Sequence, residues 1–329
     1  MIIFPTFNKF FKWNKMYEFK YDITRTLKLD FAANSKANID EPYGSLDKSD
    51  PEYKQKMDTI WNNFWNSGRP TSYHQTVSVN YQFPLNKLPI LNFMSLSTRY
   101  NGNYNWNAAP LALENLGNTI QNSQSRQYNG QINLTTLYNK VPYFKKLNKG
   151  NNTRGRPTRN RVKDEDEETE DKFEFFKHLT RFALGVKNIS VSYSENQGTM
   201  LPGFIPQPSL LGQQWSSMAP SIPFVLGSQR DIRNTAAQEG WITQDSSLNT
   251  QYKQNSSTNL TLRSTVEPIK QFRIEFNASK NTSSNNQEYF RWDNISNGFN
   301  SFSPTETGSY SISFISFPTA FVGNNDDYS

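Results

Sequence analysis

Residues 181–227 read RFALGVKNISVSYSENQGTMLPGFIPQPSLLGQQWSSMAPSIPFVLG, and they decide how the rest of the chain is interpreted. Apolar residues alternate with polar ones from Phe182 to Tyr193, which predicts a strand over 181–194. The alternation shifts by one residue at Lys187–Asn188, where we expect a β-bulge. Residues 195–247 then combine many apolar groups with Pro and Gly. We therefore expect a long ordered loop that forms a cap or a lumen element against a wall of strands.

The composition excludes several classes of protein. The chain has 329 residues, a net charge of +6, 14% aromatic residues, two histidines and no cysteine. Disulfides and thiolate metal sites are therefore impossible. The basic residues are scattered, so no nucleic-acid partner is expected. No apolar run reaches the length of a membrane-spanning helix, but transmembrane barrels also have low mean hydropathy.

The sequence offers no arrangement of residues for catalysis. Glycine-rich nucleotide-binding motifs and the nucleophile-elbow motif are absent, and no motif pairs the acidic residues. Glu195 and Asp231 are the best isolated carboxylates, although such loop residues are ordinarily solvated. We predict no enzyme activity, no catalytic residue, no cofactor and no metal.

Long alternating segments predict about eight antiparallel strands. In residues 17–31, YEFKYDITRTLKLDF, aromatic and aliphatic residues share one face over a length that could cross a bilayer. Between Asp50 and Gly68, a stripe of aromatic residues at helical spacing predicts one helix. The other predicted strands are 72–83, 94–106, 128–138, 181–194, 248–266, 272–278 and 310–314.

The connections differ in length between the two ends of this predicted sheet. Connections 32–71, 107–127, 195–247 and 279–305 fall at one end, and 84–91, 139–180 and 266–271 fall at the other. Long loops at one end and short turns at the other are typical of a transmembrane β-barrel. Two belts of aromatic residues are also expected, near the long-loop end (Tyr73, Tyr104, Trp106, Tyr128, Tyr193, Tyr252) and near the short-turn end (Tyr81, Phe83, Phe93, Tyr138, Phe272).

Two features mark the short-turn end. Residues 145–178 form an insertion with eight basic residues up to Lys163 and eight acidic residues from Asp164 to Glu174. Such blocks predict a solvated, disordered segment. A short motif, Asn-Lys-apolar-Pro, occurs twice after a predicted strand, and proline suits a turn because it cannot donate to a sheet. The motif residues are Asn86, Lys87 and Pro89, and Asn139, Lys140 and Pro142.

Many segments, in order along the chain, resemble the SprA/Sov family, the outer-membrane translocon of the type 9 secretion system and of gliding motility in Bacteroidetes. They include KNISVSYSENQGTMLPGF (187–204), Gly212, AP (219–220), FVLG (224–227), DEPYG (40–44), PLNKLP (84–89), RYNGNYNW (99–106), LGNTIQNSQ (116–124), LYNKVP (137–142), GWIT (240–243) and EPIKQFRIEF (267–276).

The resemblance implies a very large outer-membrane barrel that exports folded cargo proteins carrying a C-terminal signal. It implies three further partners: a PorV-type shuttle barrel, a periplasmic plug protein and the lipid bilayer. Residues 1–329 would then be one internal fragment of that barrel, with the insertion and the two turn motifs in the periplasm. The family-motif residues of the cap or lumen loop are Leu201, Pro202, Gly203, Phe204, Gly212, Gly227 and Trp241.

Two alternatives remain open from the sequence. A TonB-dependent-type uptake barrel would need a plug domain or an energy-coupling segment upstream. A surface-exposed β-sandwich adhesin or structural protein would have shorter strands and turns of mixed length.

Overall fold

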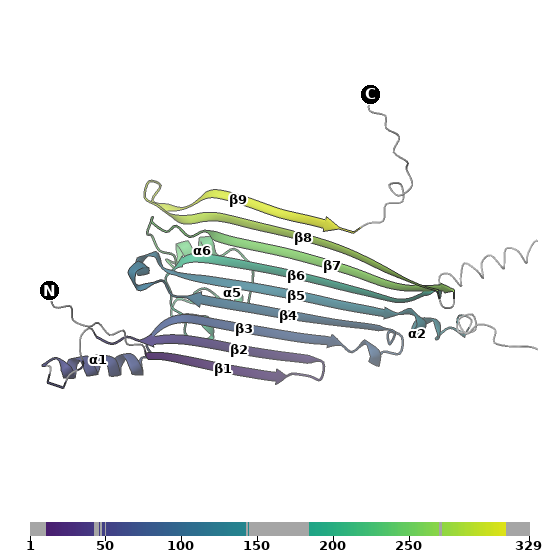
Figure 1. The fold of residues 1–329 in the computed structure, drawn as a ribbon, viewed down its shortest axis with the longest axis horizontal. Helices are drawn as coiled ribbons and strands as arrows, with labels where there is room; N and C mark the ends of the chain where they lie inside the picture. Colours follow the sequence, from purple (N-terminus) through teal and green to yellow (C-terminus); the bar gives the residue numbers. More distant parts are fainter. Residues whose placement is uncertain are drawn as a thin grey trace, which may run out of the picture.

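The computed structural model describes residues 11–42, 46, 48–49, 51–142, 144, 184–269 and 272–313. Nine antiparallel strands form one open sheet in chain order, with β1 and β9 as its two edges (Figure 1). The chain is therefore all-β, as predicted. The strands are β1 Phe11–Asp22, β2 Leu27–Ile39, β3 Arg69–Phe83, β4 Met94–Asn107, β5 Asn118–Asn133, β6 Val186–Phe204, β7 Tyr252–Ile269, β8 Phe272–Asp293 and β9 Gly298–Ile312.

Short helices lie in the connections. They are α1 Tyr53–Trp65, α2 Leu134–Tyr138, α5 Ile222–Val225 and α6 Arg233–Gln238, with 3₁₀ turns η1 Leu85–Lys87, η2 Leu111–Leu116 and η3 Leu210–Gly212. Helix α1 falls inside the range predicted from the aromatic stripe. The predicted bulge is also confirmed, because the pairing of β6 with β7 shifts register between Val186 and Asn188. The charged insertion, 145–178, and the first residues of the predicted fifth strand lie outside the described residues.

The first predicted strand, 17–31, is wrong: it is a hairpin. Strand β1 ends at Asp22 and β2 begins at Leu27. In the turn, the hydroxyl of Thr24 accepts hydrogen bonds from the backbone N–H groups of Thr26 (3.2 Å) and Leu27 (3.0 Å). Phe19 pairs with Phe31, so the turn keeps both strands in phase and the predicted apolar face survives.

Several other boundaries also differ from the prediction. Strand β5 begins at Asn118, and α2 replaces its predicted end because the side chain of Asn133 caps that helix at the N–H of Thr136 (3.1 Å). Strand β6 continues to Phe204, so the long loop spans 205–251. The predicted loop 279–305 is mostly β8 and β9, joined by the turn 294–297. That turn is closed by Asp293, whose carboxylate accepts from the N–H groups of Ile295 and Ser296.

The revised connections still differ between the ends of the sheet. Connections 40–68, 108–117 and 205–251 lie at the end that carries α1, together with the tight turn 294–297 (Figure 1). Connections 23–26, 84–93 and 270–271 are short and lie at the end that carries α2. The connection 134–185 is the long one at that end, as the sequence predicted for the insertion.

The sheet has two unlike faces, because successive side chains of a strand point to opposite sides. One face carries rows of small neutral polar residues across the strands; directly paired neighbours in one row are Ser78, Asn101, Ser125, Asn196, Ser257, Ser283 and Ser309. We call it the polar face. The opposite face holds the apolar side chains, and we call it the apolar face. One of its rows pairs Phe83, Leu96, Gly130, Val191, Leu262 and Ala278.

Candidate functional site

Residues 205–251, which we call the cap, fold back over the apolar face near the α1 end of the sheet. The main buried cluster of the molecule lies between the two layers. Strands contribute Tyr73, Tyr104, Trp106, Ile120 and Leu201, and the cap contributes Phe224, Val225, Ala236, Trp241 and Ile242. The cap therefore covers one half of the apolar face, and no other described segment covers the half toward the α2 end.

The predicted motif residues lie in three places along this contact. Leu201, Pro202, Gly203 and Phe204 end β6 instead of beginning the loop, and Trp241 joins them at the root of the cap. There the N–H of Ile205 donates to the carbonyl of Trp241 (2.8 Å), and the N–H of Thr243 donates to the carbonyl of Gly203 (2.8 Å). Gly212 and Gly227 lie farther out, over β3–β4 and β4–β5.

Glycines at these points let the backbone of the cap approach its neighbours closely. Gly212 has φ +72°, and a Cβ atom there would lie 2.8 Å from the ring of Tyr73 and 2.9 Å from the ring of Tyr104. Gly227 has φ +100°, and its Cβ would lie 2.8 Å from the carbonyl oxygen of Ser123. A larger residue at either position would be strained by its backbone angle and would also collide with the sheet.

Gly102 makes the same contact from the side of the sheet. A Cβ atom on Gly102 would lie 2.2 Å from the carbonyl oxygen of Leu226, just after α5. The hydroxyl of Tyr100 donates to that same oxygen (2.6 Å). Sequence reasoning missed Gly102. The available signal was a single glycine inside an alternating strand, which often marks a place where another backbone comes close.

A buried amide holds the middle of the cap. The Nδ2 group of Asn122 donates to the carbonyls of Phe224 (3.0 Å) and Ser228 (2.7 Å). Gln229 donates back to Oδ1 of Asn122 (3.1 Å) and accepts from the hydroxyl of Thr199 (2.8 Å). The sequence gives no sign of this network, because Asn122 is one of many amides in β5. Its satisfied hydrogen bonds fix the cap in one position.

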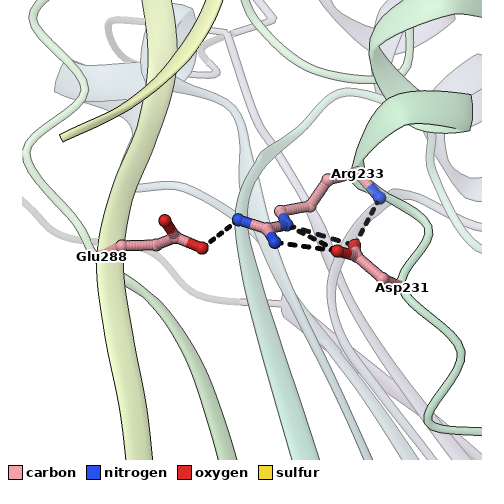
Figure 2. A network of polar contacts seen from close by, with 3 residues as sticks. All are labelled: Asp231, Arg233 and Glu288. Atoms are coloured by element: carbon pink, nitrogen blue, oxygen red, sulfur yellow. Dashed lines mark hydrogen bonds and ion pairs between the residues drawn. The ribbon is translucent and has the colours of Figure 1, made fainter. Parts of the chain in front are cut away.

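An ion-pair network ties the cap to a distant strand (Figure 2). Arg233, at the start of α6, binds Asp231 (Nη2 to Oδ2, 2.8 Å) and reaches Glu288 on β8. Its guanidinium lies over the ring of Tyr252, 4.3 Å from the centroid. Burial by itself would raise the pKa of Asp231, but hydrogen bonds from Arg233 outweigh it and the pKa lies below its usual value. The carboxylate is thus held as a structural anion.

The other isolated carboxylate, Glu195, is not in the loop. It lies in β6, where it faces Arg126 (3.9 Å) and accepts a hydrogen bond from Gln197 (2.9 Å). Both sequence candidates are therefore occupied by ion pairs. Within the part of the chain that the structure describes, no group of His, Asp and Glu side chains is placed to hold a metal ion.

The two turn motifs meet at the opposite end of the sheet. Lys140 of the second motif donates through Nζ to the carbonyls of Pro89 and Ile90 (3.2 Å to the latter). The same ammonium group lies 5.3 Å from the ring centroid of Phe93. Asn86 and Lys87 belong to η1 of the first motif, and Asn139 and Pro142 follow α2 in the second. The two copies of the motif, which are far apart in the sequence, thus contact each other through Lys140.

The predicted aromatic belt at the long-loop end is largely wrong. Tyr73, Tyr104, Trp106 and Tyr252 are at most 2% exposed, because the cap covers them. Tyrosines instead gather in two neighbouring rows where the cap ends, which we call the tyrosine rows. The first row contains Tyr21, Tyr100 and Tyr310 with the Arg126–Glu195 pair, and the second contains Tyr81, Tyr128 and Tyr193.

Beyond the tyrosine rows, the apolar face is exposed down to the short turns. We call this part the apolar band; its exposed members include Val191 (37%), Leu262 (42%), Phe276 (46%) and Phe272 (56%). Along β8 the band runs from Ala278 to Phe272, because Lys280 lies in the second tyrosine row. At about 3.3 Å per residue this is about 20 Å of strand. With the usual tilt of barrel strands, the band covers about 15 Å of the roughly 25 Å apolar belt of outer-membrane barrels.

Comparison with family models and with curated proteins identifies no relative. No family model matches the chain, and no curated protein matches it. None of the described helices is both long and apolar enough to cross a membrane. The geometry of the two faces and the cap is therefore the basis for a functional proposal.

Proposed function

We propose that this chain is part of a protein-conducting outer-membrane β-barrel that exports folded proteins, the function implied by its resemblance to the SprA/Sov family. One observation carries the proposal: the apolar band lies directly behind a polar face, where the row at its upper border contains Ser97, Asn129, Ser192 and Thr261. In an outer-membrane barrel, the first would contact lipid and the second would line the water-filled lumen.

The polar face supports transport of large hydrophilic cargo. Two neighbouring rows of this face contain only Ser, Thr, Asn and Gly from β3 to β9. The first is the row of Ser78 described above, and the second pairs Thr76, Asn103, Ser123, Gly198, Asn255, Asn285 and Thr307. Hydroxyl and amide groups exchange hydrogen bonds with water and bear no charge to hold a passing protein. No cofactor and no chemical step is needed.

The position of the cap supports one of its two expected roles. The cap packs on the apolar face, next to the apolar band, and leaves the polar face uncovered. In the proposed barrel it would lie on the outer wall above the membrane and would not narrow the lumen. The open edges β1 and β9 would pair with further strands of the barrel, since an unpaired strand edge is not stable in hydrocarbon.

The resemblance supplies the remaining parts of the proposal. Cargo would carry a C-terminal secretion signal, and the partners would be a PorV-type shuttle barrel, a periplasmic plug protein and the bilayer. The cell would be a Gram-negative bacterium in which the same barrel supports gliding. The short-turn end, with the Lys140 contact, would face the periplasm.

Photo-crosslinking during export tests this proposal. A photoreactive amino acid replaces Ser125 in β5 or Ser257 in β7, both on the polar face. In the matched controls it replaces Val191 in β6 or Leu262 in β7, both in the apolar band. We expect adducts with folded cargo only from the two serine positions. Cargo adducts from the apolar band would contradict the proposal. If neither face gives adducts and the chain does not fractionate with the outer membrane, the proposal also fails and a surface adhesin is favoured.

A further inference from the structure

The margin of the cap that faces the apolar band is itself apolar. Helix α5 turns Phe224 and Val225 toward the sheet, where they are 1% and 3% exposed. Ile222 and Leu226, four residues apart and therefore on the same side of the turn, are 46% and 40% exposed. We call these two residues the rim. Their side chains point away from the buried contact that holds the cap.

The rim has a fixed height above the apolar band. The carbonyl of Leu226 accepts from the hydroxyl of Tyr100, which belongs to the first tyrosine row. The second row, with Tyr128 and Tyr193, follows two residues farther along each strand, which is about 7 Å. The rim thus lies beside the first tyrosine row, and the two tyrosine rows separate it from the apolar band.

The tyrosine rows have the composition of a membrane interface. Tyrosine is enriched where one end of a side chain is apolar and the other is wet. The first row also carries the Arg126–Glu195 pair, with Arg126 45% and Glu195 21% exposed, among its tyrosines. Charged and amphipathic side chains at one level suit the headgroup region, with hydrocarbon on one side and water on the other.

From this juxtaposition we propose that Ile222 and Leu226 enter the headgroup region of the outer leaflet, so that the cap fixes the depth of the sheet in the membrane. The inference rests on the proposed barrel function. A lipid surface fits better than a protein partner, because the rim borders the tyrosine rows, which in turn adjoin the apolar band. Two aliphatic side chains are also far less than the roughly 800 Å² that each partner of a stable protein interface buries.

The absence of cysteine from the sequence allows a direct test. Single cysteines carrying an environment-sensitive fluorophore are placed at Ile222 and Leu226 (rim), Leu262 (apolar band), Ser257 (polar face) and Leu210. Leu210 is a matched control: it lies on the same cap, is apolar and is 62% exposed, but belongs to η3, which packs on β3 near Tyr73. The variants are made in the complete barrel that contains this chain, without cysteine at any other position, because the edges β1 and β9 need partner strands in hydrocarbon. That barrel is reconstituted into phosphatidylcholine vesicles, and quenching by iodide in water is compared with quenching by nitroxide-labelled lipids.

We expect iodide to quench Leu210→Cys and Ser257→Cys several-fold more strongly than Leu226→Cys and Leu262→Cys. Headgroup-labelled lipid should quench Leu226→Cys best, and chain-labelled lipid should quench Leu262→Cys best. If Leu262→Cys is protected while Leu226→Cys and Ile222→Cys are quenched by iodide as strongly as Leu210→Cys, the rim inference is overturned and the barrel proposal stands. If Leu262→Cys is quenched like Ser257→Cys, both fail.

Discussion

Replacing Gly102 in β4 by alanine should displace the edge of the cap at Leu226, although no residue of the cap is changed. The added Cβ would lie 2.2 Å from the carbonyl oxygen of Leu226 and 2.9 Å from its carbonyl carbon. Both atoms are backbone, so no side-chain rotation can relieve the contact. The neighbouring carbonyls of Phe224 and Ser228 are held by Asn122, which also opposes a shift. The cap must therefore move by about 1 Å or detach along this edge.

The expected cost follows from three contributions. Overpacking a well-packed contact costs about 1–3 kcal/mol. Displacing Leu226 also breaks the hydrogen bond from Tyr100, which is worth about 1 kcal/mol. Against these, alanine is about 0.5–1 kcal/mol more favourable than glycine inside a strand. The net effect is about 2 kcal/mol against the docked cap, which raises the population of the open cap about 30-fold.

Limited trypsin digestion measures that population. Arg230 and Arg233 lie in the cap, and Arg233 is engaged by Asp231 and Glu288, so cleavage after Arg233 requires the cap to open. Mass spectrometry of the fragment ending at Arg233 gives its rate of appearance. Gly130→Ala is the matched control, because it lies on the same face one strand away and its Cβ would have no neighbour closer than 4.0 Å. Equal cleavage rates in the two variants would refute the close approach of Leu226 to Gly102.

Three further predictions use the same folded chain. Phe276→Arg, in the middle of the apolar band, should lower the free energy of unfolding of the membrane-inserted sheet by about 2–4 kcal/mol in urea titrations. Asn277→Arg, on the polar face, should change that free energy little. Equal losses in the two variants would contradict the contact of the apolar band with lipid. Gly212→Ala should destabilise the docked cap by about 1–3 kcal/mol more than Gly240→Ala. Both glycines have a positive φ, but only at Gly212 would the added Cβ also collide with the tyrosine rings. Faster trypsin cleavage of Gly240→Ala than of Gly212→Ala would exclude that packing. The pKa of Asp231 is lowered in the folded state, so its ion pair with Arg233 stabilises the cap above about pH 4, and this stabilisation is lost as the pH falls through the folded-state pKa. Cleavage of the cap by pepsin should therefore rise at low pH in the wild type. The rise should be smaller in Asp231→Asn, which has no carboxylate to protonate.

The sequence predicts which face each side chain occupies better than it predicts where strands end. Phe19 and Phe31 share a face as predicted, although a turn separates them, because four turn residues preserve the alternation. In β8 and β9, residues 279–288 and 303–309 include no large apolar side chain, so alternation gives no signal there. These residues are strands because β7 supplies a ladder of partners for β8 and β8 supplies one for β9, which is a tertiary effect.

The cap shows the other limit of sequence reasoning. Its Pro, Gly and apolar residues predict an ordered loop, but nothing in them states which face of the sheet it covers. Tyr73 and Tyr104 therefore resemble a membrane belt in the sequence, although the structure buries them under Gly212. Only the pairing of residues distant in the chain, such as Asn122 with Phe224, distinguishes a capped tyrosine from an exposed one.

The lengths of the strands explain why such a cap is present. A tilted barrel strand needs about 9–11 residues to cross a bilayer, whereas β6 has 19 residues and β8 has 22. The sheet therefore extends well beyond any membrane that the apolar band could occupy, and its alternation continues over that extension. Without cover, Tyr104, Trp106, Ile120 and Leu201 would expose an apolar surface to water, where such patches promote association. The same alternating face can thus meet lipid in one half and the cap in the other, with the tyrosine rows at the boundary.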